Sequence, residues 1–190
     1  MKGDSIMPKK VLIAYATRTG TTREIAEGIG KIFIDSGIQV EITPVKKVRM
    51  LDGYDAIILG TAVRFGMLMR EMVRFVRKKK TALSKYPVAA FEVCLSMKKE
   101  TPEHHKTADT YLDPIRREVA LLSEGHFAGK MEYAKLGFIA RFIIKKMVQT
   151  PEGDFREWDM IEAWTRKLIE QLETVHTKAT VIERTELVGA

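Results

Sequence analysis

The chain has 190 residues, of which 45% are hydrophobic and 30% charged, a composition typical of one globular domain with a substantial core. The formal net charge of +7 favours anionic partners, without choosing among a small ligand, nucleic acid and an acidic membrane surface. The single cysteine, Cys94, excludes an internal disulfide, and no apolar run reaches the roughly 18–20 residues of a membrane span. The first ten residues lack the apolar segment of a secretory signal, so we expect a cytoplasmic protein.

The first half of the chain alternates strand and helix patterns. Apolar residues 10–16 predict a strand, and apolar residues at helical spacing predict a helix over 22–36 that ends at Ser36-Gly37. Residues 38–44 alternate apolar and polar side chains, which indicates a half-exposed outer strand. The continuously apolar residues 55–60 predict a strand that is covered on both faces. The next helix has one apolar face, formed by Leu68, Met72, Phe75 and Val76.

The second half continues this alternation. Residues 87–95 predict a strand that begins with a proline, and residues 126–131 predict a weaker fifth strand. Between them, Pro114 is expected to start or kink a helix whose apolar face is formed by Tyr111, Leu112, Ile115, Val119 and Leu122. The last helix is expected over 155–173, where Asp154 and Glu157 have the spacing of a capping box, and residues from about 175 onward are expected to form a ragged tail. The apolar side of that helix consists of Trp158, Ile161, Thr165, Leu168 and Leu172.

Five strands that alternate with helices predict an α/β fold, with a doubly wound parallel sheet and helices on both faces. In such sheets, ligands bind at the carboxyl ends of the strands, near the point where the strand order reverses. Three segments of this chain follow predicted strands at that edge: 17–22, 61–67 and 93–98. A ligand whose phosphate lies in the first segment would have its body between the other two.

The first of these segments, Thr17-Arg18-Thr19-Gly20-Thr21-Thr22, is the most informative in the chain. The first turn of a helix has unpaired N–H groups and a partial positive charge, so it attracts an anion such as phosphate. The threonine hydroxyls add hydrogen bonds, and Gly20 permits a sharp turn and close approach. No lysine follows the glycine and no G-x-G-x-x-G pattern is present, so the common triphosphate and dinucleotide loops are excluded. The segment is either a site for a terminal phosphate monoester or a threonine-rich helix cap without a ligand.

Over roughly residues 10–173, the chain resembles flavodoxin-type, FMN-binding proteins. The phosphate signature of that family is matched by Tyr15, Thr17, Gly20, Thr22 and Ala26, while Ala14 stands where the family usually has a larger apolar residue. The resemblance implies a five-stranded parallel sheet of order 2-1-3-4-5 and FMN as cofactor. It assigns FMN binding to three groups: Thr17, Arg18, Thr19, Gly20, Thr21 and Thr22 for the phosphate; Thr61, Ala62, Val63, Arg64, Phe65 and Gly66 on one side of the ring; and Val93, Cys94 and Leu95 on the other.

A narrower resemblance concerns the menaquinone-dependent protoporphyrinogen dehydrogenase branch of this family. It rests on Gly60–Gly66, on the long segment before the last helix and on Glu157-Trp158-Asp159. This branch passes electrons from a porphyrinogen through FMN to a quinone. Two alternatives remain: an electron carrier for a larger redox partner, although typical carriers are acidic and compact, and a module that binds nucleic acid or membrane. Since no nucleic-acid motif is present, we expect no nucleic-acid partner.

Individual residues near the expected ring site have more than one interpretation. Arg64 either favours the reduced, anionic flavin or pairs with an acidic group, and Phe65 either stacks on the ring or covers the core. Cys94 is expected to be a small buried apolar residue. Glu92 interrupts an apolar strand, so it is expected at a solvated end or in an ion pair, with proton acceptance as the lesser alternative. The pair His104-His105 lacks neighbouring ligands at metal spacing, so no metal site is expected.

Two basic segments bear on partners. The first follows the ring loop and contains Arg70, Arg74, Arg77, Lys78, Lys79 and Lys80. The second, Lys135–Val148, is both basic and apolar on more than one face. It either packs over the domain as an insertion at about 132–154 or lies on an anionic membrane, which would make the protein peripheral to the inner membrane face. We expect one domain over 1–174 and a tail over 175–190, and the sequence leaves the oligomeric state open.

Overall fold

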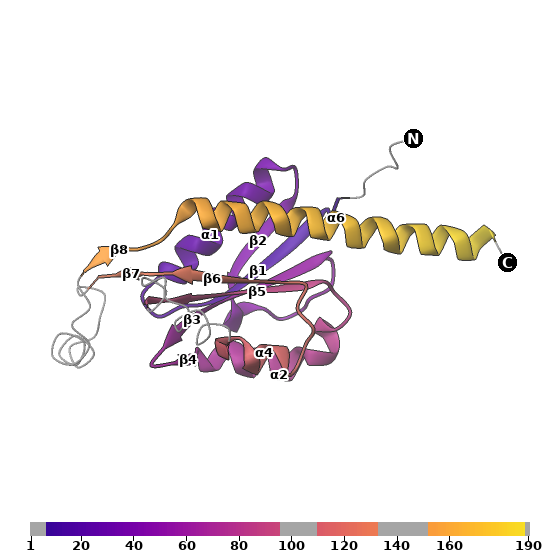
Figure 1. The fold of residues 1–190 in the computed structure, drawn as a ribbon. Coiled ribbons are helices and arrows are strands. Elements are labelled where there is room, and N and C mark those ends of the chain that lie inside the picture. The colour runs from indigo at the N-terminus through magenta and orange to yellow at the C-terminus, as the bar shows by residue number, and fades with distance from the viewer. Residues whose placement is uncertain (1–6, 96–109, 133–151, 189–190) are drawn as a thin grey trace.

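The computed structural model describes residues 7–95, 110–132 and 152–188. A twisted parallel sheet lies in the middle of the molecule, with α1 and α6 on one face and α2 and α4 on the other (Figure 1). The helices are α1 (Thr21–Asp35), the 3-10 helix η1 (Val45–Lys47), α2 (Arg70–Leu83), α4 (Asp113–Arg116) and α6 (Trp158–Val188). The three-layer α/β architecture predicted from the sequence is therefore confirmed.

The sheet has the predicted strand order. Its parallel strands run in the order β2-β1-β3-β5-β6, which corresponds to 2-1-3-4-5 because the short β4 only pairs antiparallel with β3. The strands of this sheet are β1 (Lys10–Ala16), β2 (Gln39–Pro44), β3 (Ala56–Arg64), β4 (Met67–Leu68), β5 (Val88–Cys94) and β6 (Ser123–Ala128). A separate antiparallel pair is formed by β7 (Lys130–Met131) and β8 (Gly153–Asp154).

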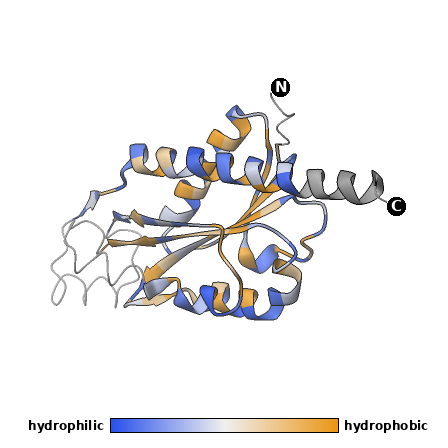
Figure 2. Cartoon of the chain, turned by 45° about the vertical axis from the view of Figure 1, so that its right-hand side comes forward, coloured by the Kyte–Doolittle hydropathy of each residue, from blue (hydrophilic) through white to orange (hydrophobic). Residues whose placement is uncertain are grey.

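Side chains of the central strands alternate between two apolar cores, because both faces of a parallel sheet are covered. On one face, Ile13 and Phe91 belong to the core beneath α1 and α6. On the other, Leu12 and Ile57 pack with Met72 of α2. Figure 2 shows hydrophobic colour in the strands and hydrophilic colour on the outer surfaces of the helices. The strand β2 is only half-buried, as its alternating sequence predicted.

The helix predicted around residues 111–122 is wrong in length. Among the described residues, the four-residue helix α4 has Pro114 in its first turn, and a turn at Leu112 separates it from the helical residues 110–111. The apolar residues Leu112, Ile115 and Val119 are nevertheless buried against the second core. They meet that core through successive turns, since spacings of three and four residues are satisfied by turns as well as by a continuous helix.

The ends of two other elements also differ from the prediction. The fifth strand, β6, begins at Ser123 rather than His126, and its polar first residues concealed this start. The predicted capping box is wrong, because α6 begins at Trp158 and the Asp154 carboxylate in β8 accepts hydrogen bonds from Arg156. The predicted end at Glu173 is wrong as well: the helix continues to Val188, since no glycine or proline interrupts the intervening sequence.

The basic, apolar segment Lys135–Val148 and His104-His105 lie outside the described residues. Within the described part of the chain, no helix is long and apolar enough to cross a bilayer.

Candidate functional site

The turn between β1 and α1 has a helix N-terminus without a side-chain cap. Gly20 is the N-cap residue and has φ 98° and ψ −17°, the left-handed conformation that glycine adopts without strain. Its N–H donates a hydrogen bond to the Thr17 hydroxyl at 3.1 Å. Among the described residues, no side chain caps the first N–H groups of α1. These N–H groups, at the positive end of the helix dipole, are therefore available to an anion.

The hydroxyl groups of the first turn add to this arrangement. Thr22 is fully buried, and its Oγ1 has no hydrogen-bond partner in the described part of the chain. Thr21 is also buried. A buried hydroxyl without a partner costs about 1–3 kcal/mol, so folded proteins rarely keep one without a use for it. A phosphate at the helix N-terminus would accept a hydrogen bond from this hydroxyl, and the loop therefore fits a phosphate monoester.

The second predicted segment is a hairpin rather than a loop. The strand β3 continues through Thr61 to Arg64, and Phe65 and Gly66 form a two-residue turn into β4. Both turn residues have positive φ, 51° for Phe65 and 73° for Gly66, as a tight hairpin turn requires. The prediction of a loop from residue 61 is wrong because the sheet pairing of β3 extends past its apolar run.

The tip of this hairpin presents apolar side chains to solvent. Phe65 is 64% exposed and Met67 is 60% exposed. The Arg64 guanidinium carbon lies 5.2 Å from the centre of the Phe65 ring, and Arg64 has no acidic partner among the described residues. A left-handed backbone at a phenylalanine is strained by about 1–2 kcal/mol. The structure therefore holds an exposed aromatic ring and a guanidinium group together at the carboxyl edge of the sheet.

The third predicted segment, which begins at Val93, lies at the same carboxyl edge of the sheet. Val93 and Cys94 are buried at the end of β5, as expected for small apolar residues. Cys94 and Ala128 form a small apolar cluster against which Val63, Tyr111 and Phe155 pack. A Cβ added at Gly129 would lie 3.2 Å from Val93 and 3.9 Å from both Leu95 and Thr21. The structure therefore brings the phosphate loop and the end of β5 together around this glycine.

The strand register unites the three predicted segments. Ala16 pairs with Thr61, and Ala62 pairs with Val93, so the ends of β1, β3 and β5 lie side by side. This alignment places an uncapped helix N-terminus, an exposed aromatic hairpin and a buried strand end along one sheet edge. Such an edge, near the reversal of strand order, is where doubly wound sheets bind nucleotides.

One buried acid near this edge has a partner that the sequence did not indicate. Glu92 is fully buried, and its Oε1 lies 3.4 Å from His126 Nδ1 on the adjacent strand β6. Its Oε2 has no hydrogen-bond partner among the described residues. Burial is the largest influence on Glu92 and raises the pKa of its carboxyl group, while His126 opposes that effect. A solvated position for Glu92 is therefore excluded; its partner is His126, and the two form an ion pair only when the imidazole is protonated.

Arg156 is a second residue that sequence reasoning missed. Its side chain is only 9% exposed, and its guanidinium binds Asp154 at 2.8 Å and Glu24 of α1 at 2.7 Å. Its guanidinium carbon lies 4.9 Å from the centre of the Trp158 ring, which packs on Gly28 of α1. These contacts fasten the segment before α6 to the first turns of α1. The only sequence signal was the aromatic and charged character of residues 156–159.

A doubly wound sheet with a hydroxyl-rich, uncapped helix N-terminus defines the class of open-sheet α/β proteins that bind phosphate-bearing ligands. The chain belongs to the flavodoxin-domain family, because the family model described as flavodoxin domain matches residues 12–157. This membership confirms the predicted family and FMN as the cofactor.

Comparisons with individual proteins agree with this family. The chain is 27% identical over 177 residues to the protoporphyrinogen IX dehydrogenase [quinone] of Escherichia coli K12, covering 84% of this chain and 94% of that protein. A Leishmania major protein of the same name is 24% identical over 150 residues, covering 76% of this chain and 64% of that protein. A short-chain flavodoxin associated with a PDU bacterial microcompartment superposes with a TM-score of 0.58 at 13% identity, covering 86% of this chain and 99% of that structure. The structural likeness shows the fold alone.

Proposed function

We propose that this protein is an FMN-dependent dehydrogenase that oxidises a porphyrinogen and delivers the electrons to a quinone. The observation that carries this proposal is the similarity to the E. coli protoporphyrinogen dehydrogenase along 94% of that protein's length. The match extends well beyond the phosphate loop, and it includes the hairpin and the start of the last helix that sequence analysis associated with this branch.

We assign the FMN phosphate to the Thr17–Thr22 turn. In this assignment, the backbone N–H groups at the start of α1 and the Thr22 hydroxyl donate hydrogen bonds to the phosphate oxygens. Thr17 holds the turn closed through its bond to Gly20 N–H. Arg156 binds Glu24 and so offsets the negative charge of this carboxylate in the first helical turn, beside the assigned phosphate.

The ring site is assigned to the hairpin and to the end of β5. FMN, when bound, supplies two-electron oxidation of an organic substrate and passes the electrons to an acceptor. Arg64 places a positive charge at the hairpin tip, where it would favour the reduced flavin, and Phe65 offers an aromatic face. Val93, Cys94 and Leu95 contribute an apolar wall without an aromatic ring. In this assignment, the described residues on this side do not cover the flavin ring with an aromatic side chain, which would admit an organic substrate.

An electron carrier for a larger redox protein is the second candidate function. It is favoured by the exposed Phe65 and Met67, which could contact a protein partner. The two functions differ in one measurable respect. A dehydrogenase accepts electrons directly from porphyrinogen, whereas a carrier requires a protein donor.

The test is an anaerobic reaction of the oxidised, FMN-loaded protein with protoporphyrinogen, followed by a menaquinone analogue. We expect porphyrinogen to bleach the flavin absorbance and the quinone to restore it. Conversion of one porphyrinogen to porphyrin removes six electrons and six hydrogens, so three such two-electron cycles, with three quinones reduced to quinols, should yield one porphyrin. Bleaching only by a reductase protein would support the carrier instead. A flavin that neither porphyrinogen nor a reductase can reduce would contradict both functions.

We also propose that Lys135–Val148 contacts an anionic membrane, where a quinone would be found. Replacing Lys145 and Lys146 with glutamate is expected to weaken binding to vesicles that contain anionic lipid. Replacement of Lys31 on α1 and Lys167 on α6 with glutamate makes the same change in net charge and serves as the control. Unchanged vesicle binding in the Lys145 and Lys146 variant would contradict this proposal.

A further inference from the structure

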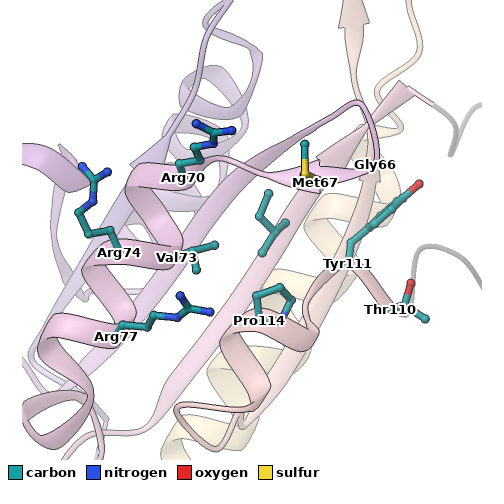
Figure 3. Close-up of a pocket in the computed structure, with 10 residues that line it drawn as sticks. Gly66, Met67, Arg70, Val73, Arg74, Arg77, Thr110, Tyr111 and Pro114 are labelled. Carbon is teal, nitrogen blue, oxygen red and sulfur yellow. The ribbon is translucent and has the colours of Figure 1, made fainter.

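A pocket of about 810 Å³ lies between α2 and α4, on the sheet face opposite α1 and α6. Figure 3 shows that it is bounded by the β3–β4 hairpin at one end, by α2 along one side and by the residues that lead into α4 along the other. Its lining includes Gly66, Met67, Arg70, Arg74, Arg77 and Tyr111. The volume is within the range typical of small-molecule sites.

The charge along this pocket is concentrated on α2. Arg70, Arg74 and Arg77 are spaced by four and three residues, so they share one side of the helix and repel each other. Arg77 lies 3.4 Å from Glu118, but Arg70 and Arg74 have no acidic partner in the part of the chain that the structure describes. The one acidic residue of α2, Glu71, pairs with Lys46 instead. Two arginines without an acidic partner among the described residues therefore lie on α2 beside the pocket; Figure 3 shows the Arg74 side chain extending away from Tyr111 and Pro114, so its guanidinium must turn about the side-chain bonds to reach a ligand in the cavity.

The rest of the lining is largely apolar. Tyr111, Pro114 and Val73 lie across from one another in the pocket, and Met67 covers the end near the hairpin (Figure 3). A nucleic-acid backbone or a free phosphate would leave these apolar surfaces without a contact. Arginine binds carboxylates through paired, charge-assisted hydrogen bonds, and apolar walls stabilise a large ring. The combination matches a large apolar ring system that carries carboxylates at its edge.

We propose that this pocket binds the carboxylate-bearing edge of a macrocyclic substrate, with Arg70 and Arg74 as the carboxylate ligands. This inference rests on the proposed porphyrinogen-oxidising function and locates its substrate. The quinone acceptor carries no carboxylate, so the arginines distinguish the substrate from the acceptor. Gly66 and Met67 follow directly after Arg64 and Phe65, so a ligand held along α2 extends to the same hairpin that we assign to the flavin ring.

The test uses binding without turnover. Mesoporphyrin, a redox-inert porphyrin with two carboxylates, and its uncharged dimethyl ester are titrated into the FMN-loaded protein, and the quenching of protein fluorescence is measured. The variant R70E/R74E reverses both charges. The control variant K31E/K167E makes the same change in net charge on α1 and α6, which cover the other face of the sheet.

We expect R70E/R74E to bind mesoporphyrin at least tenfold more weakly than the wild type, and the control to stay within twofold. The ester should bind weakly to all three proteins. Equal losses of mesoporphyrin affinity in both variants would show a general electrostatic effect and overturn the assignment of the pocket. Binding of the dimethyl ester as tightly as the acid would also overturn it. If R70E/R74E fails to fold by circular dichroism, R70Q/R74Q replaces it with the same expectations.

The failure of this inference is separable from the failure of the proposed function. Porphyrinogen that reduces the flavin of R70E/R74E with unchanged KM would overturn the pocket and leave the dehydrogenase function standing. Arginine-dependent mesoporphyrin binding without any flavin reduction by porphyrinogen would sustain the pocket and overturn the dehydrogenase function.

Discussion

Replacement of Thr22 by valine tests the phosphate loop through two effects of opposite sign. Thr22 is fully buried and its hydroxyl has no partner among the described residues. Valine has nearly the same shape and removes the unpaired group, whose burial costs about 1–3 kcal/mol. We therefore expect the FMN-free variant to be more stable than the wild type by about 1–2 kcal/mol. For a chain of this length, that corresponds to a rise in Tm of about 2–8 °C.

The same substitution should weaken FMN binding. In the FMN-loaded protein, the Thr22 hydroxyl is proposed to donate a hydrogen bond to the charged phosphate, and such bonds contribute about 1.5–3 kcal/mol. The expected loss of FMN affinity is therefore about 10- to 150-fold. A substitution that stabilises the protein but weakens ligand binding indicates that the original residue serves binding rather than folding.

The assay combines thermal denaturation of FMN-free protein with fluorescence titration of FMN. Thr165→Val is the matched control, because Thr165 is also fully buried but its hydroxyl donates to the Ile161 carbonyl at 2.7 Å. We expect T165V to gain no stability and to bind FMN like the wild type. A T22V variant that loses stability and keeps its FMN affinity would refute the assigned role of this hydroxyl.

Three further predictions concern the packing and charges around the site. Burial raises the pKa of Glu92, so the contribution of its protonated carboxyl group to stability is present below the unfolded-state pKa and is lost as the pH rises through the folded-state pKa. E92Q, which cannot ionise, should therefore be more stable than the wild type by about 1–3 kcal/mol at pH 8, and this difference should disappear near pH 4. A pH-independent difference in urea denaturation would contradict this prediction. A Cβ at Gly60 would lie 2.3 Å from Phe91 Cζ, so G60A should lower the free energy of unfolding by about 1–3 kcal/mol. Replacement of the Phe91 ring by a smaller side chain in G60A/F91L should recover part of that loss. Simple additivity of the two changes would argue against this clash. Arg156→Leu should destabilise the protein by about 2–4 kcal/mol because it removes a buried guanidinium that binds both Glu24 and Asp154. The further change E24Q should restore part of the stability in a double-mutant cycle, and zero coupling between the two positions would show that their ion pair contributes nothing.

The sequence predicted the elements whose signals are local. Continuous apolar runs identified β1, β3 and β5, and the helical spacing of Ile25, Ile29 and Phe33 identified α1 within one residue at each end. The order of the sheet came from the family resemblance, and the phosphate-loop residues stood out because hydroxyls and a glycine fall between a strand and a helix.

The features that escaped prediction depend on residues far apart in the chain. The hairpin at Phe65 requires a positive φ at a phenylalanine, which no sequence rule favours. Glu92 and His126 are 34 residues apart, and Arg156 and Glu24 are 132 residues apart, so only the register of β5 with β6 and the docking of the segment before α6 bring each pair together. The pocket beside α2 likewise arises only when this helix lies beside the residues that precede α4.

The function proposed for this protein depends on the Thr17–Thr22 turn binding FMN by its phosphate. The most direct test compares the affinities of FMN and riboflavin, which differ only in that phosphate, for the wild type and for the variant T17A/T19A/T22A. We predict that the wild type binds FMN at least about 100-fold more tightly than riboflavin, because several charge-assisted hydrogen bonds depend on the phosphate, and that the triple variant loses most of this preference. Equal affinities of the wild type for both flavins, or an undiminished preference in the variant, would contradict the claim.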